Sequence, residues 1–197
     1  MFGAWLGEDV ARVSKIAIEW APEPRRDYLD DNTSFDTYAE CRLVDGRQAA
    51  IGIEVKYTEG PYSWGKAERT RMFDQSSLYH QVHRRSKLYV DGALEPLRTP
   101  ELKQLWRNQL LGEAMLARAA LGIDVFTSVL VYPEGNDHYD TAGRDHAALL
   151  APSERTPFVT VTLEAMIAEC RALAGDDVRA RAWLDYLGRR YLVGRAK

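Results

Sequence analysis

The sequence predicts an α/β fold: a mixed β-sheet that contains a central β-hairpin and is flanked by helices on both faces. Two segments with alternating apolar and polar residues flank the turn sequence Asp45-Gly46, which is typical of a hairpin. A long amphipathic segment follows, and then a continuous apolar run of strand length at residues 124–132. A hairpin, a helix and further strands in this order favour a sheet covered by helices.

The composition fits one compact domain over residues 1–197, because 46% of the residues are hydrophobic and 28% are charged. The net charge of −3 disfavours a surface that coats nucleic acid broadly, but it is compatible with an acidic metal site beside a basic rim. No apolar run approaches the roughly 20 residues of a membrane helix, and the N-terminus lacks signal-peptide features. Cys41 and Cys170 have neither metal-site nor disulfide spacing, so we expect a soluble, cytoplasmic protein.

Two strands, at residues 34–44 and 49–57, form the predicted hairpin, and alternation gives each strand one apolar and one polar face. The apolar faces carry Phe35, Thr37, Ala39, Cys41 and Leu43 on the first strand, and Ile51, Ile53, Val55 and Tyr57 on the second. The polar faces carry Asp36, Tyr38, Glu40 and Arg42 on the first strand, and Gly52, Glu54 and Lys56 on the second.

The remaining elements follow from apolar periodicity and turn residues. Thr99, followed by Pro100, is the expected N-cap of a long helix that ends at Gly122. The other expectations are a strand at 14–20, a loop at 58–66, a loosely helical stretch at 75–83, irregular chain at 88–98, a polar loop at 133–153, a strand at 157–161, and helices at 163–174 and 177–192.

The register of the hairpin decides whether Asp36 reaches the polar face of the return strand. A strict two-residue turn at Asp45-Gly46 would place Asp36 opposite Val55, on the wrong face. One additional loop residue, Arg47, after a left-handed glycine places Asp36 opposite Lys56. The apolar alternation requires this second register, because a slip by one residue would expose a whole strand face.

In this register two carboxylates, Asp36 and Glu54, converge beside Lys56. Two anions repel each other unless a cation lies between them. Mg²⁺ prefers oxygen ligands and is usually held by one or two carboxylates, water and substrate phosphate. Lys56 can orient or help to deprotonate a water molecule, and it can stabilise a negative transition state. The combination favours hydrolysis of phosphodiesters.

The same residues resemble the core of the PD-(D/E)xK nuclease superfamily. The sequence N-T-S-F-D at 32–36, the turn, and I-E-V-K-Y at 53–57 are similar to a bacterial subgroup of nuclease-like proteins, and the resemblance covers roughly residues 32–132. It implies a restriction-endonuclease-like fold, dependence on Mg²⁺ or Mn²⁺, and action on DNA. Family members often act as dimers, so a homodimer is also among the expectations.

The resemblance also implies roles for individual residues. Asp36, Glu54 and Lys56 are the implied catalytic residues, and the implied metal ligands are Asp36, Glu54 and the carbonyl of Val55. The sequence departs from the family pattern at Phe35, which stands where the motif name has proline. An acidic helix upstream is also not evident, and Glu8 and Glu19 are alternative sources of a further carboxylate.

Several other residues have a functional and a structural interpretation. Gln75 and Tyr79 resemble the Q-x-x-x-Y motif of exonucleases, although an ordinary amphipathic helix is the favoured explanation. Arg107 or Gln109, on the helix after the hairpin, could contact phosphate or simply face solvent. The basic segment 66–87, with Tyr62, Trp64, Phe73 and Tyr79 in or near it, could grip a nucleic-acid backbone or form a solvated face.

The four histidines carry a weaker signal. His80 and His83 have metal-binding spacing but no third ligand nearby, and His138 and His146 are expected to face solvent in a polar loop. The sequence therefore predicts a Mg²⁺-dependent nuclease acting on DNA. The alternatives are an inactive module that binds nucleic acid or protein, a hydrolase of another phosphate ester, and a surface strand with a cross-strand Asp–Lys pair.

Overall fold

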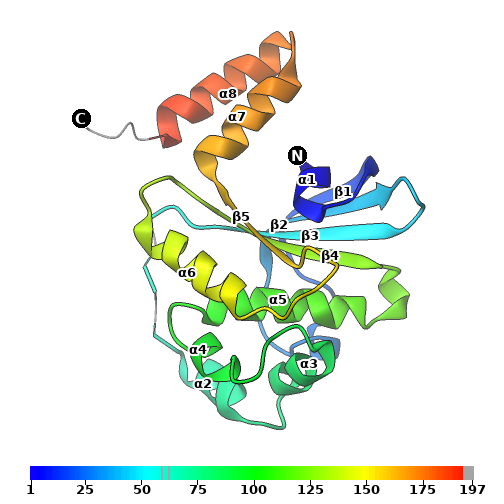
Figure 1. Ribbon diagram of the computed structural model, residues 1–197, viewed down its shortest axis with the longest axis vertical. Helices are drawn as coiled ribbons and strands as arrows, with labels where there is room; N and C mark the ends of the chain where they lie inside the picture. Colours follow the sequence, from blue (N-terminus) through cyan, green and yellow to red (C-terminus); the bar gives the residue numbers. More distant parts are fainter. Residues whose placement is uncertain (59, 62, 193–197) are drawn as a thin grey trace.

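A computed structural model describes residues 1–58, 60–61 and 63–192. Its centre is a five-stranded sheet with the order β1-β2-β3-β4-β5 (Figure 1). The strands are β1 (Val10–Trp20), β2 (Phe35–Leu43), β3 (Gln48–Val55), β4 (Val125–Tyr132) and β5 (Phe158–Thr162). The pairs β1–β2 and β2–β3 are antiparallel, whereas β3–β4 and β4–β5 are parallel. The predicted mixed sheet with a central hairpin is confirmed.

Helices cover both faces of this sheet, as predicted. They are α1 (Phe2–Leu6), α2 (Lys66–Phe73), α3 (Leu78–Ser86), α4 (Leu94–Leu97), α5 (Lys103–Leu116), α6 (Asp137–Ala148), α7 (Leu163–Ala174) and α8 (Val178–Tyr191). Figure 1 shows α2 to α6 on one side of the sheet, and α1 with the pair α7–α8 on the other. None of the helices within the described ranges is long and apolar enough to cross a membrane.

The middle strands are buried on both faces, which is typical of strands in a parallel sheet between helices. Every residue of β4 is buried. On the side of α5 the core contains Phe35, Tyr38 and Trp106, and on the side of α1 and α7 it contains Cys41 and Ile51. Cys41 is a buried free thiol, as expected for a small core residue.

The predicted face of Phe35 is wrong. Its ring joins Tyr38 in the core on the α5 side, although alternation assigns the two residues to opposite faces. The exception occurs at the first residue of β2, before backbone pairing with β3 begins at Thr37. There the ring lies over Gly52, where a Cβ atom would stand 2.4 Å from it. Glycine at this position therefore makes room for Phe35 above the hairpin.

A predicted helix start and a predicted loop also need correction. The helix expected to begin at Thr99 begins at Lys103, whose amide donates to the Thr99 carbonyl (2.9 Å), so residues 99–102 form a turn that leads into α5. The expected polar loop at 133–153 contains α6, whose buried face is Tyr139, Ala142, Gly143 and His146. Its spacing is helical, but two of its four residues are too small to produce an apolar signal.

Candidate active site

The hairpin loop has one residue more than a two-residue turn, but this residue precedes Asp45 instead of following Gly46. The Leu43 amide donates to the Arg47 carbonyl (2.9 Å), so the loop comprises residues 44–46. Gly46 has the expected left-handed conformation, with a φ of 92°. The expectation that Arg47 is the additional loop residue is therefore wrong.

This turn brings Asp36 next to Glu54 in register. The β2–β3 ladder ends with the pair Thr37–Ile53, and the next residues along the two strands are Asp36 and Glu54. The predicted opposition of Asp36 and Lys56 is wrong. The predicted face is nevertheless correct, because a shift of two residues preserves the alternation of a strand.

Asp36 is tied to the end of β3 by a hydrogen bond. The Val55 amide donates to Oδ2 of Asp36 (2.7 Å), just beyond the last backbone pair of the ladder. The Asp36 carboxylate thus takes the place of a backbone acceptor where the two strands stop pairing. This bond fixes the carboxylate beside the segment that carries Glu54 and Lys56.

Glu54 and Lys56 form a direct ion pair. The Nζ of Lys56 lies 2.7 Å from Oε1 of Glu54, and the two side chains are only 12% and 3% exposed. The Lys56 amide donates to the Val131 carbonyl (2.8 Å), which extends the pairing of β3 with β4 by one residue. Both members of the pair therefore stand on a backbone that the sheet holds in place.

Helix α5 supplies two amide donors that the sequence pattern did not indicate. The Nδ2 of Asn108 donates to Oε2 of Glu54 (2.7 Å), and the Nε2 of Gln104 donates to Oε1. The two residues are four apart, so they lie on one face of the helix. We call Asp36, Glu54, Lys56, Gln104 and Asn108 together the Glu54 cluster.

The environment perturbs both members of the ion pair. Burial raises the pKa of Glu54; the Lys56 ammonium counteracts this in part, and the Asp36 carboxylate adds to it. Burial lowers the pKa of Lys56, but the adjacent Glu54 carboxylate outweighs this effect, and the pKa lies above its usual value. Perturbed groups of this kind are more frequent at functional sites than elsewhere.

The donor set of the cluster suits a hard divalent cation. In the part of the chain that the structure describes, no three His, Cys, Asp or Glu side chains form a complete metal cage. Mg²⁺ does not need such a cage, because one or two carboxylates, water and a substrate phosphate suffice. Asp36 and Glu54 follow the last pair of the β2–β3 ladder, and the Asp36 carboxylate is close enough to raise the pKa of Glu54.

Arg107, expected near the site, belongs to a neighbouring cluster instead. It donates to Asp31 (3.2 Å), Thr33 (2.8 Å) and Glu68 (2.8 Å). Lys103, one turn earlier and fully buried, donates to Glu68 (3.0 Å). These residues form the Arg107 cluster, which connects α5 with α2 and with the chain before β2.

The other α5 and α3 candidates are not at the site. Gln109 is buried within the helix layer, beside Glu113. Gln75 precedes α3, whereas Tyr79 is buried within it and donates to Asp31. The Q-x-x-x-Y interpretation is therefore wrong, because the two residues do not share a helix face.

Three of the four histidines pack in or against the core. His80 bonds the Met72 carbonyl (2.8 Å), and His83 accepts from the indole of Trp106 (3.3 Å). His146 is fully buried on α6, and burial lowers its pKa to about 3. The expectation that His146 faces solvent is wrong, because the loop assigned to it is a helix.

The basic segment 66–87 forms α2 and α3 and does not present a row of free aromatic rings. Tyr79 is buried, and Trp64 packs edge-on against Phe73 (5.7 Å between ring centroids). Arg69 lies over both of these rings. Tyr62 lies outside the described residues. The rings and the arginine thus largely contact each other.

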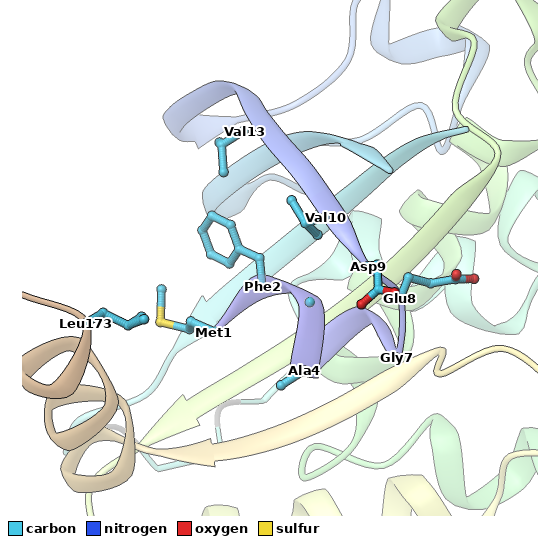
Figure 2. Close-up of a pocket in the computed structure, with 10 residues that line it drawn as sticks. Met1, Phe2, Ala4, Gly7, Glu8, Asp9, Val10, Val13 and Leu173 are labelled. Atoms are coloured by element: carbon cyan, nitrogen blue, oxygen red, sulfur yellow. The ribbon is translucent and has the colours of Figure 1, made fainter. Parts of the chain in front are cut away.

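Of the two upstream acids, Glu8 is remote from the cluster. It lines a cleft between α1 and β1 with Asp9 and Val10 (Figure 2), and it pairs with Arg47 (2.8 Å) at the turn end of the hairpin. Glu19 is exposed and lies at the opposite end, between the cross-strand pairs of β1 and β2 that flank Asp36. Of these two acids, only Glu19 lies at the same end of the sheet as the Glu54 cluster.

A mixed sheet with two carboxylates and a lysine at the end of its central hairpin defines the restriction-endonuclease-like class of α/β proteins. The family model for the PD-(D/E)XK nuclease superfamily matches residues 1–193. The chain therefore belongs to the PD-(D/E)XK nuclease superfamily, as the resemblance of its hairpin predicted. No curated protein and no solved structure matches it.

Proposed function

We propose that this protein is a Mg²⁺- or Mn²⁺-dependent nuclease that hydrolyses phosphodiester bonds of DNA, with residues 1–197 acting as one domain. The observation that carries the proposal is the charge of the Glu54 cluster. Asp36 and Glu54 contribute two carboxylates, whereas Lys56 contributes one ammonium group, so the formal charge is −1 when all three are ionised. One divalent cation would reverse this surplus and attract a phosphate.

Asp36 and Glu54 would hold the cation, together with the carbonyl of Val55. When bound, such an ion acts as a Lewis acid and lowers the pKa of bound water. Gln104 and Asn108 orient the Glu54 carboxylate through their amide groups, as partners of metal ligands commonly do. They leave lone pairs of the carboxylate available, because an ionised carboxylate has about four acceptor positions.

Lys56 has two roles in this proposal. Its ammonium group, held by Glu54, orients the attacking water from one side of the scissile phosphate. It also stabilises the negative charge that develops on the phosphoryl oxygens. A raised pKa keeps Lys56 protonated near neutral pH, which suits charge stabilisation better than proton abstraction.

Cleavage of plasmid and single-stranded DNA with Mg²⁺ or Mn²⁺ tests the proposal. We expect Lys56→Ala and Asp36→Ala to reduce the cleavage rate by on the order of 10²–10³-fold, because each removes a charge that acts on the transition state. Arg12→Ala, an exposed change on β1, is the control and should cleave like the wild type. Undiminished cleavage by both site variants would refute the assignment.

A second candidate is an inactive module that binds nucleic acid or protein on the same fold. It is favoured by the satisfied state of Glu54, which accepts hydrogen bonds or an ion pair from Lys56, Gln104 and Asn108. The two candidates differ in metal uptake. A calorimetric titration without heat from Mg²⁺ or Mn²⁺ would favour the inactive module.

A further inference from the structure

Helix α8 carries a row of arginine and aromatic side chains on its exposed face. Arg179, Trp183, Tyr186 and Arg190 are spaced by four, three and four residues, so they form one stripe along the helix. All four are exposed, Trp183 to 59% and Tyr186 to 42%. The packed side of α8 is marked by Leu184, which is buried. We call these four residues the α8 stripe.

A group of large exposed aromatic residues indicates a binding surface, because soluble domains seldom expose such residues in groups. The rings of Trp183 and Tyr186 lie 5.4 Å apart and only 22° from parallel. They form a stacked platform that the described residues leave exposed. An arginine stands at each end of this platform, within the same row.

The charge of α8 is complementary to a phosphate backbone. The helix contains four arginines, Arg179, Arg181, Arg189 and Arg190, and a single acid, Asp185. Asp185 is paired with Arg171 of α7 (3.2 Å), so it does not neutralise the stripe. A surface that bound only an apolar partner would not require this excess of positive charge. Arginine beside aromatic rings is the combination that binds unpaired nucleotides.

The stripe leads toward the Glu54 cluster. Tyr191, the last residue of α8, packs edge-on against Tyr57 (5.9 Å), and the Tyr57 hydroxyl donates to the Tyr191 carbonyl (3.1 Å). Tyr57 directly follows Lys56 in the chain. It also lines a cleft of about 820 Å³ beyond the ends of β3 and β4. One end of α8 is thereby joined to the segment that carries the catalytic lysine.

We propose that the α8 stripe binds single-stranded DNA and guides it to the Glu54 cluster, an inference that rests on the proposed nuclease function. Bases stack on Trp183 and Tyr186, and the flanking arginines contact phosphates. From Arg179 to Arg190 the helix rises about 16 Å, roughly the length of five nucleotides at 3.4 Å each. A duplex cannot use this platform, because pairing hides the faces of its bases.

The test is fluorescence anisotropy with a labelled 20-nucleotide oligo-dT in EDTA, where binding is measured without cleavage. The double variant Trp183→Ala/Tyr186→Ala should bind roughly 10- to 100-fold more weakly than the wild type. Trp183→Phe/Tyr186→Phe should restore most of the affinity, since it keeps both rings. Arg179→Ala/Arg190→Ala should lower the slope of log affinity against log salt by about 1.4.

Three controls make the outcome decisive. Arg12→Ala/Arg26→Ala removes two exposed arginines elsewhere, and Leu173→Ala removes an exposed apolar side chain of α7; both should bind like the wild type. The third control is the readout: binding is scored in EDTA and cleavage with Mg²⁺, so a failure of the nuclease proposal is distinguishable from a failure of this one.

Unchanged binding by the alanine double variant would overturn the proposal. So would equal loss of duplex and single-strand binding, or stronger binding of oligo-U RNA than of DNA. Sedimentation provides the remaining alternative: a wild-type dimer that the double variant converts to monomer, without any change in DNA binding, would assign the stripe to a second copy of this chain.

Discussion

Helix α5 contributes to two buried charged clusters that differ in their balance of charge. The Arg107 cluster contains two acids, Asp31 and Glu68, and two bases, Lys103 and Arg107, so it is formally neutral. The Glu54 cluster has one more acid than bases. Buried charges are costly unless they are paired. The neutral cluster is complete within the protein, whereas the acidic one is suited to a further cation.

The two clusters lie on adjacent stripes of the same helix. Lys103 and Arg107 are four residues apart, and so are Gln104 and Asn108, which follow them by one position. The charged pair holds α2 and the chain before β2, while the amide pair holds the Glu54 carboxylate. The charged pair on α5 therefore stabilises the fold, and the amide pair, one residue further along the helix, positions the Glu54 carboxylate.

The largest effect on stability is expected from the Arg107 cluster. Arg107→Met leaves Asp31 and Glu68 short of a partner, and we expect a loss of about 3–5 kcal/mol in the free energy of unfolding. Urea denaturation measures this loss. Arg144→Met, which breaks an exposed pair with Asp140 on α6, is the control and should cost less than about 1 kcal/mol. Equal effects of the two variants would remove the distinction between the clusters.

A smaller effect, on activity, is expected from the amide pair. Gln104→Ala and Asn108→Ala should each reduce cleavage by about 10–100-fold and raise the Mn²⁺ concentration for half-maximal rate, because the Glu54 carboxylate loses its orientation. Gln81→Ala, an exposed glutamine on α3, is the matched control. A wild-type Mn²⁺ dependence in both α5 variants would show that these amides do not position Glu54.

The smallest effect concerns the pH dependence of the free energy of unfolding, measured on the metal-free protein in EDTA. Because the Glu54 pKa is raised in the folded state, the folded protein keeps a proton that the unfolded chain loses above about pH 4.3. The contribution of Glu54 to stability therefore falls as the pH rises from there to the folded-state pKa, by about 1.4 kcal/mol for each pH unit in that interval. Glu54→Gln should abolish this fall. A parallel pH profile for both proteins would contradict the raised pKa.

The face of the candidate site was predictable from sequence, but its register was not. Alternation within β3 places Glu54 and Lys56 on one face, and the need to keep the apolar faces of both strands together adds Asp36 to it. Two registers that differ by two residues keep the same faces, and apolar periodicity cannot distinguish them. The conformation of residues 44–46 decides between them, and this depends on backbone bonds that the alternation does not encode.

The contribution of α5 was only partly predictable. Its apolar spacing predicts a helix after the hairpin, but the rotation of a helix on a sheet depends on packing against distant residues. Arg107 and Gln109 were therefore expected near the site, where Gln104 and Asn108 lie. For α6 the obstacle was composition, since Ala142 and Gly143 pack closely on the sheet without appearing hydrophobic.

The central claim is that Asp36 and Glu54 share one divalent cation, and calorimetric titration of Mn²⁺ into the wild type and Asp36→Asn tests it most directly. We expect one ion per wild-type chain and binding at least tenfold weaker in Asp36→Asn, with Asp45→Asn, an exposed acid in the hairpin loop, as the control. The ion should also raise the melting temperature of the wild type alone. No uptake by the wild type, or equal uptake by Asp36→Asn, would contradict the claim.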